Sequence, residues 1–239
     1  MNRKIVAFVC LAWIPATLAL DAGSGFGRQN LLGLIAWVCL VAFLCREDSL
    51  TRLQVAIVVV YATFIEYLFS DYLGAYRYRL HNVPAFVPPG HGLVYLAALA
   101  GGRSEWVRAR RVWLIGSLLA VGTAYAAWGY FFSPRPDGVG AFWFGCLVLF
   151  MVRGRAPLVY ASAFVIVTYL ELLGTSLGIW TWSRIDPVLG RFTLGNPPSG
   201  IAGAYCFLDA AALSVAPWLV GLGVRVRRLH STTELATDG

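Results

Sequence analysis

Charged side chains are scarce in this sequence. Asp, Glu, Lys and Arg make up 13% of the 239 residues, whereas 59% of the residues are hydrophobic. A soluble domain carries about 25% charged residues. Because so little polar surface cannot coat a globule in water, the composition excludes a soluble enzyme, a nucleic-acid-binding module and a disordered protein. It predicts an all-α integral membrane protein that lies in the lipid bilayer.

Lysine is nearly absent. The formal net charge of +7 comes from 19 basic residues, of which only Lys4 is a lysine, against 12 acids. A basic balance can indicate a nucleic-acid partner, but in an apolar chain it more often reflects the basic loops that orient membrane helices. We therefore expect the bilayer, and no nucleic acid, as the partner.

Motifs for metal and phosphate binding are also lacking. The five cysteines have no paired spacing and the three histidines are scattered, which argues against a disulfide framework and a zinc site. There is no phosphate-binding glycine loop. There is also no DDxxD-type acid cluster that would hold Mg²⁺ for ionising a prenyl diphosphate. We expect neither a metal nor a cofactor.

Eight apolar segments are present. They run roughly over residues 5–20, 31–44, 53–70, 92–100, 112–132, 139–152, 158–173 and 200–224. A full crossing needs about 20 apolar residues, and about 17 can suffice. The fourth segment is short, so seven transmembrane helices is the alternative to about eight.

Loop charge favours eight crossings. With a cytoplasmic N-terminus, 13 of the 19 basic residues fall on the cytoplasmic side, as the positive-inside rule requires. If the fourth segment did not cross, this bias would largely cancel. We expect a plasma (inner) membrane protein with both termini cytoplasmic and a disordered tail at 229–239. The first segment also has the build of a signal peptide.

The chain repeats itself at an offset of 105 residues. Thr63, Glu66 and Ser70 match Thr168, Glu171 and Thr175, and the stretch Leu73 to Tyr78 matches Leu177 to Trp182. Both copies then reach a proline-rich turn, at Pro88 and at Pro197. Four segments separate the copies, and an even number predicts a parallel repeat. We expect two four-helix repeats, at 1–105 and 106–228. Chance similarity of apolar helices is the alternative.

Three acids lie inside apolar segments: Glu66, Glu171 and Asp209. A charged side chain at the centre of a span costs about 2.5–3.5 kcal/mol on insertion scales, so such residues face the bundle interior and mark functional sites. Burial favours the neutral acid, which suits general-acid chemistry. The alternative is that these acids only tie helices together.

Further candidates surround these acids. Helical spacing places a threonine and a second hydroxyl residue on the same face as each glutamate. The aromatic residues that follow could line a pocket for a carbocation or form an interfacial belt, and Asn196 could bind a ligand or cap a helix. The substrate-binding candidates are Thr63, Ser70, Tyr76, Tyr78, Thr168, Thr175, Trp180, Trp182 and Asn196.

These residues carry two family resemblances. The length, the glutamate late in the third span and the aspartate in the last resemble the integral-membrane terpene cyclases of meroterpenoid and indole-terpenoid pathways (the pyripyropene-cyclase-like family). The resemblance implies Glu66 and Asp209 as catalytic acids. The run from Glu171 to Trp182, followed by Gly195-Asn196-Pro197-Pro198, is more faintly similar to the lycopene-cyclase domain. Ser199-Gly200 stand where that domain carries further acids.

The sequence thus predicts a membrane-bound, metal-independent terpene cyclase acting on a lipophilic isoprenoid. A protonated carboxyl, Glu66 by preference, protonates an alkene or epoxide. Glu171 or Asp209 steadies the cation or takes the final proton. The alternatives are an isoprenoid, sterol or carotenoid isomerase or hydratase, a small proton-coupled lipid transporter, and an assembly factor.

Overall fold

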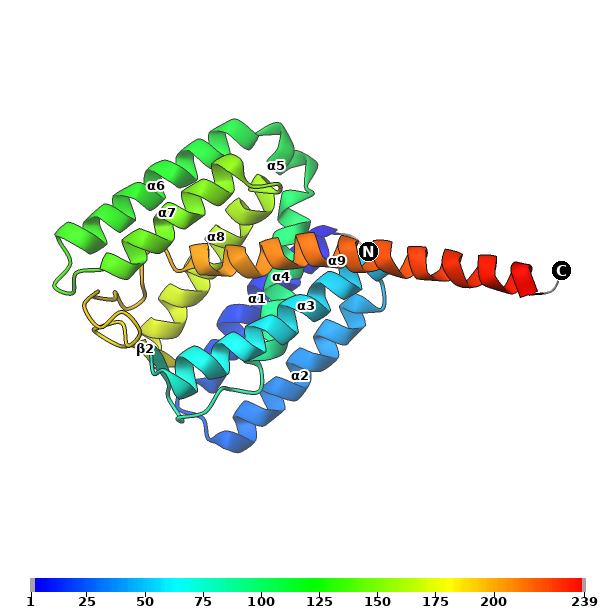
Figure 1. Cartoon of the computed structure of the whole chain (residues 1–239). Coiled ribbons are helices and arrows are strands. Elements are labelled where there is room, and N and C mark those ends of the chain that lie inside the picture. Colours follow the sequence, from blue (N-terminus) through cyan, green and yellow to red (C-terminus); the bar gives the residue numbers. More distant parts are fainter. Residues whose placement is uncertain (1–2, 238–239) are drawn as a thin grey trace.

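The computed structural model describes residue 6 and residues 8–222 in full, and of residues 3–5, 7 and 223–237 the backbone alone. The tail predicted at 229–239 lies outside the fully described residues. The chain is mostly helical (Figure 1). Its elements are α1 (Arg3–Asp21), α2 (Phe26–Leu44), α3 (Ser49–Glu66), the π-helix η1 (Tyr67–Tyr72), β1 (Tyr76–Tyr78), α4 (Val87–Gly102), α5 (Glu105–Ala109), α6 (Arg111–Phe131), α7 (Gly138–Arg153), α8 (Pro157–Ser176), β2 (Trp180–Trp182) and α9 (Ala202–Thr237).

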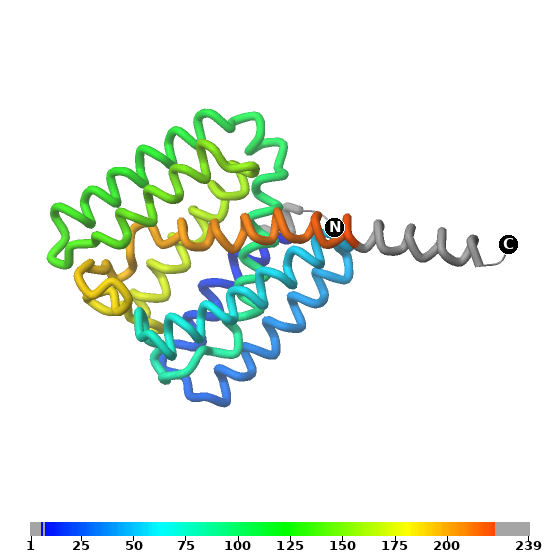
Figure 2. Tube along the Cα trace, viewed as in Figure 1, coloured from blue at the N-terminus to red at the C-terminus, as the bar shows by residue number. Residues whose placement is uncertain are grey.

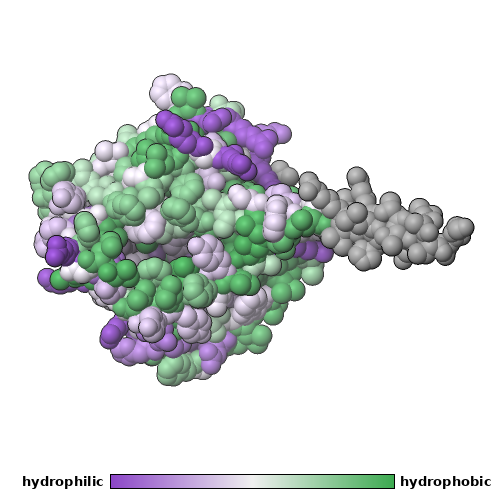
Figure 3. Space-filling view, in the orientation of Figure 1, coloured by the Kyte–Doolittle hydropathy of each residue, from purple (hydrophilic) through white to green (hydrophobic). Residues whose placement is uncertain are grey.

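Five helices in the described part of the chain are long and apolar enough to cross a membrane. They cover Phe26–Leu44, Ser49–Tyr72, Arg111–Phe131, Pro157–Ser176 and Ala202–Leu222. Hydrophobic residues cover much of the molecular face in Figure 3, and many large hydrophobic side chains of the described residues are exposed, Val112 and Trp113 among them. An apolar exterior of this kind is stable in lipid, which supports the prediction of an all-α membrane protein.

Helices cover nearly all of the eight apolar segments; the third segment runs from α3 into η1, and the short fourth one lies in α4. Pro88 and Pro89 begin α4, where the missing N–H groups cost nothing, and nearly all of its residues are buried. Helix α4 packs against α1, α2, α3 and α8. It is therefore the central helix of the bundle. Because other helices surround it, its apolar side chains face these helices and not lipid.

Small residues allow the central helices to approach closely. A Cβ on Gly102 would lie within 2.8 Å of Val159 in α8, and one on Gly101 within 2.6 Å of Ser162. Such contacts are how membrane helices gain packing energy without a hydrophobic driving force. The main partner of α4 is α8, and the main partner of α3 is α9, so helices from the two ends of the chain interleave (Figure 2).

A short antiparallel ribbon closes one end of the bundle. Strand β1 pairs with β2, with Tyr76 opposite Trp182 and Tyr78 opposite Trp180. The sequence did not predict these strands. Arg135 fastens the ribbon from the α6–α7 turn, because its guanidinium donates to the carbonyl oxygens of Trp182, Ser183 and Leu194. The ribbon therefore holds its side chains in fixed positions above the helices.

Candidate functional site

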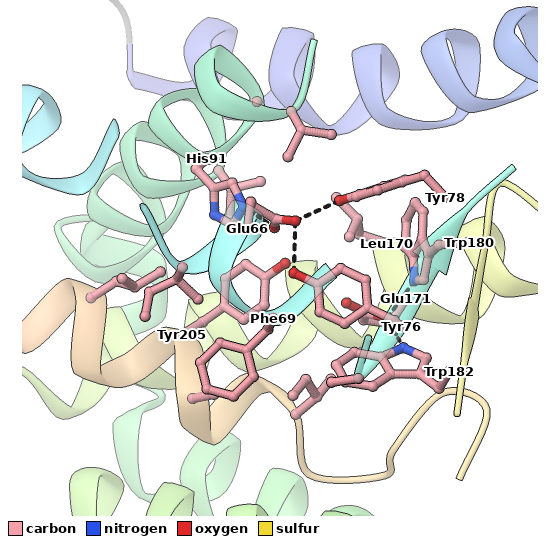
Figure 4. Close-up of a pocket in the computed structure, with 18 of the residues that line it drawn as sticks. Glu66, Phe69, Tyr76, Tyr78, His91, Leu170, Glu171, Trp180, Trp182 and Tyr205 are labelled. Atoms are coloured by element: carbon pink, nitrogen blue, oxygen red, sulfur yellow. Dashed lines mark hydrogen bonds and ion pairs between the residues drawn. The ribbon is translucent and has the colours of Figure 1, made fainter. Parts of the chain in front are cut away.

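The principal cavity of the described residues has a volume of about 430 Å³ and lies beneath the ribbon. Six α-helices, the π-helix η1 and both strands contribute to its wall, which is mostly aliphatic and aromatic. Both glutamates of the repeated motif, Glu66 and Glu171, line it (Figure 4). A largely apolar pocket of 300–1,000 Å³ with a few convergent polar groups is typical of a small-molecule site.

Glu66 is held by three side chains. The hydroxyls of Tyr76 and Tyr78 donate to its Oε2 over 2.7 and 2.8 Å. Its Oε1 lies 2.9 Å from Nε2 of His91, which is on α4. Both oxygens of this buried carboxyl thus have hydrogen-bond partners.

Glu171 is held differently, by two indoles. The Nε1–H groups of Trp180 and Trp182 donate to its Oε2 over 2.9 and 3.1 Å. In the described part of the chain, Oε1 of Glu171 makes no hydrogen bond. The two glutamates therefore occupy matching places in the sequence but have chemically different partners.

The ribbon explains how four aromatic side chains reach two carboxyls. Alternate residues of a strand point to the same face, so Tyr76, Tyr78, Trp180 and Trp182 are buried while Arg77 and Thr181 between them are exposed. The rings of Tyr76 and Trp182 lie 4.6 Å apart, and those of Tyr78 and Trp180 lie 6.0 Å apart. A continuous aromatic layer thus joins the two acids.

Glycines make this geometry possible. Gly74 and Gly178 precede the two strands with φ of 71° and 67°, a region that residues with a Cβ avoid. In α8, a Cβ on Gly174 would overlap the ring of Trp180. Trp180 therefore lies directly on the helix backbone, and its indole reaches Glu171 one turn earlier.

Most of the lining residues were not predicted, among them His91, Tyr205 and Asp186. His91 bonds Glu66, and Tyr205 of α9 stacks on His91 with ring centroids 5.1 Å apart and planes 18° apart. Asp186, in the loop after β2, also lines the cavity, and its Oδ1 accepts from the backbone N–H groups of Val188 and Leu189. The placement of His91 directly after Pro88-Pro89-Gly90 is visible in the sequence, but its partner is not.

The predicted hydroxyls do not line the cavity. Thr63 donates to the Val59 carbonyl over 2.6 Å and Thr175 donates to the Glu171 carbonyl over 2.7 Å, each within its own helix. Ser70 is buried in η1 and Thr168 is half-buried. Asn196 accepts from the backbone N–H of Trp182 over 2.9 Å and so supports β2.

Asp209 lies apart from the two glutamates. It is buried in α9, one turn beyond Tyr205, but does not line the cavity. Its Oδ2 has no hydrogen-bond partner, and neither does the buried hydroxyl of Tyr95. The structure thus places Glu66 and Glu171 in one cavity, whereas Asp209 is buried in α9 outside that cavity.

Residues 174–178 read Gly-Thr-Ser-Leu-Gly, which matches the G-x-S-x-G motif of serine hydrolases. That motif requires a sharp turn from a strand into a helix. Here Ser176 ends α8, is exposed, and donates to the Leu173 carbonyl over 2.8 Å. Ser176 is therefore not positioned as the nucleophile of a serine hydrolase.

Among the described residues, no three His, Cys, Asp or Glu side chains converge as a set of metal ligands.

No family model matches the chain, and neither a curated protein nor a solved structure is significantly similar to it. The function must therefore be inferred from the cavity itself.

Proposed function

We propose that this protein is a membrane-embedded isoprenoid cyclase that starts its reaction by protonating an alkene. The observation that carries the proposal is the presence of two carboxyls, Glu66 and Glu171, in one apolar, aromatic cavity. Each is oriented by aromatic donors from the same ribbon. A proton donor and a proton acceptor in a shared dry chamber are what such a reaction needs.

The reaction is an isomerisation, so its protons balance. One group delivers a proton to a terminal alkene, and the resulting cation is attacked by a second alkene to close a ring. A second group then removes a proton from the carbon beside the new cation. Aromatic faces stabilise the cation in between, and the apolar wall keeps out water that would trap it.

The substrate class follows from the wall of the cavity. Aliphatic and aromatic side chains make up most of it, and α1, α3, α4 and α9 contribute about half of them. Tyr61 and Phe207 line the cavity and are also exposed on the flank of the bundle. A long hydrocarbon could therefore enter sideways from the lipid, which favours an acyclic isoprenoid over a soluble substrate.

The same features support eight crossings arranged as two parallel four-helix repeats. Glu66 ends α3 and Glu171 lies in the last two turns of α8. A glycine with positive φ and then a three-residue strand follow each of them. The packing is reciprocal as well, since α4 lies on α8 and α9 lies on α3. A pseudo-twofold axis through the ribbon accounts for all of these matches.

The proposal can be tested with purified protein in phospholipid vesicles containing lycopene, squalene or geranylgeraniol, in D₂O buffer. We expect at least one of them to yield a cyclic isomer carrying one deuterium, detected by mass spectrometry, and Glu171→Gln to yield none. Glu105→Gln, on the exposed helix α5, is the matched control and should react like the wild type.

Two results would overturn the proposal. One is that neither these isoprenoids nor an extract of host-cell lipids changes. The other is a product that has gained D₂O or has only moved a double bond, because this would identify a hydratase or an isomerase instead.

A further inference from the structure

The two carboxyls differ in what their partners can do with a proton. An indole N–H can only donate, whereas an imidazole can donate from one nitrogen and accept at the other. Glu171 is bonded only by indoles among the described residues, and Glu66 is bonded by two phenols and His91. This difference assigns a direction to the proton transfer.

Glu171 has the surroundings of a proton donor. Its Oε2 already accepts two N–H groups, so an acidic proton must reside on Oε1, which has no bonded partner in the described residues. Once that proton leaves, the two indoles remain to stabilise the carboxylate. Donors that await a developing charge are the usual means by which a site lowers a barrier.

Glu66 has the surroundings of a hydrogen-bond acceptor. Two phenol hydroxyls donate to Oε2, and Oε1 faces Nε2 of His91 at 2.9 Å. A carboxylate in this position selects the imidazole tautomer that carries its hydrogen on Nε2. The other nitrogen, Nδ1, is then a free base, and no described residue bonds it. The stack on Tyr205 fixes the plane of the ring.

Building on the cyclase function proposed above, we propose that Glu171 is the proton donor and that Nδ1 of His91 is the final proton acceptor, with Glu66 as the residue that positions His91. This assignment replaces the preference for Glu66 as the donor that the sequence suggested. Glu66 and His91 then act as one unit on the wall formed by α3 and α4, across the aromatic layer from Glu171.

The proposed cyclisation conserves every electron pair. The π pair of the first alkene forms a C–H bond with the proton of Glu171, whose O–H pair stays on oxygen. The second alkene forms the new C–C bond. The adjacent C–H pair becomes a double bond as its proton moves to Nδ1, which gives an imidazolium beside the Glu66 carboxylate. That proton returns to Glu171 by exchange with solvent before the next turnover.

The test uses the vesicle assay in D₂O and follows deuterium in both the product and the recovered substrate. With His91→Gln, the amide can still donate to Glu66, but the imidazole base Nδ1 is gone, and Glu66 stays engaged by the hydroxyls of Tyr76 and Tyr78. The cation can then only return its proton, or a deuteron, to Glu171. We expect cyclic product to fall by about 10²- to 10⁴-fold, while the recovered polyene still gains deuterium. With Glu171→Gln we expect neither product nor labelled polyene.

Each other outcome contradicts the assignment. If His91→Gln also stops deuterium uptake, His91 belongs to the donor side; if its product is unchanged, His91 is not the base. If Glu171→Gln still labels the polyene, Glu171 is not the donor. A wild-type protein without turnover contradicts the cyclase proposal itself. His81→Asn, on an exposed histidine outside the cavity, is the control for the loss of an imidazole.

Discussion

For single residues, the site depends on hydrogen-bond donors that hold the buried carboxyl of Glu66 in place. The two phenols on Glu66 are such donors, and hydrogen bonds to charged groups contribute about 1.5–3 kcal/mol each. We expect Tyr76→Phe or Tyr78→Phe to slow product formation by about tenfold or more, since about 1.4 kcal/mol corresponds to a factor of ten. The double variant should be slower than either single one, measured as the initial rate in lipid vesicles.

The control for these variants is Tyr72→Phe, because Tyr72 is 83% exposed and lies outside the cavity. Its rate should equal that of the wild type. Full activity in the double variant would show that Glu66 does not need its phenol donors.

The sequence could predict part of this site. Glu66 and Glu171 follow from a polar motif repeated inside apolar segments, and the four ribbon aromatics follow from the same repeat. His91 could not be predicted, because a single histidine in an apolar segment has no partner until α4 packs against α3. The hydroxyls of Thr63 and Thr175 share a helical face with the glutamates, yet a backbone carbonyl one turn away offers each a nearer acceptor.

At the scale of the helix, Gly174 decides whether Trp180 can reach Glu171. We expect Gly174→Ala to destabilise the protein by about 1–3 kcal/mol, because a Cβ there overlaps the indole and overpacking has costs of this size. The ring must also move, which weakens its bond to Glu171 and lowers activity. Thermal unfolding in detergent and the vesicle rate measure the two effects.

Gly116→Ala is the matched change, since a Cβ there meets nothing within 4 Å. In a helix interior it should be neutral or slightly stabilising. Equal behaviour of the two alanine variants would contradict the packing of Trp180 on α8.

The start of α3 depends on Asp48. Its Oδ1 accepts from the backbone N–H of Thr51 over 2.8 Å, and this bond holds the pKa of Asp48 below its ordinary value. A lowered folded-state pKa means that the cap stabilises the protein above the unfolded-state pKa, about 3.9, and that this stabilisation is lost as pH falls through the folded-state value. We expect Asp48→Ala to cost about 1 kcal/mol at pH 7 and much less at pH 3, by unfolding in detergent at both pH values.

Local sequence patterns predict the helices of this protein but not its two strands. Long apolar runs place the helices, because every backbone group in lipid must be bonded within its own segment. The strands at Tyr76–Tyr78 and Trp180–Trp182 are three residues long, and each depends on a partner about a hundred residues away. No local periodicity could reveal them. The π-helix after Glu66 likewise follows from the need to turn the chain into β1, which is a tertiary constraint.

At the scale of the whole molecule, the ribbon constrains the topology. Strands β1 and β2 pair directly, so both must lie on the same side of the membrane. This favours an even number of crossings between them and agrees with the charge bias that predicts eight spans. In a seven-span arrangement the fourth segment would not cross, and the two strands would be separated by the bilayer.

This topology can be tested by introducing cysteines and labelling intact cells with a membrane-impermeant maleimide. Asp71 precedes β1, Leu189 follows β2, and Arg155 lies in the α7–α8 turn, and all three are exposed. We expect Asp71→Cys and Leu189→Cys to be labelled from outside, whereas Arg155→Cys and the native, exposed Cys45 react only after permeabilisation. Labelling of Asp71→Cys and Leu189→Cys from opposite sides would contradict eight crossings. Labelling of Cys45 and Arg155→Cys in intact cells, with neither Asp71→Cys nor Leu189→Cys labelled, would show the opposite orientation. Because the ribbon aromatics bond Glu66 and Glu171, the same result decides which leaflet lies nearest the proposed site.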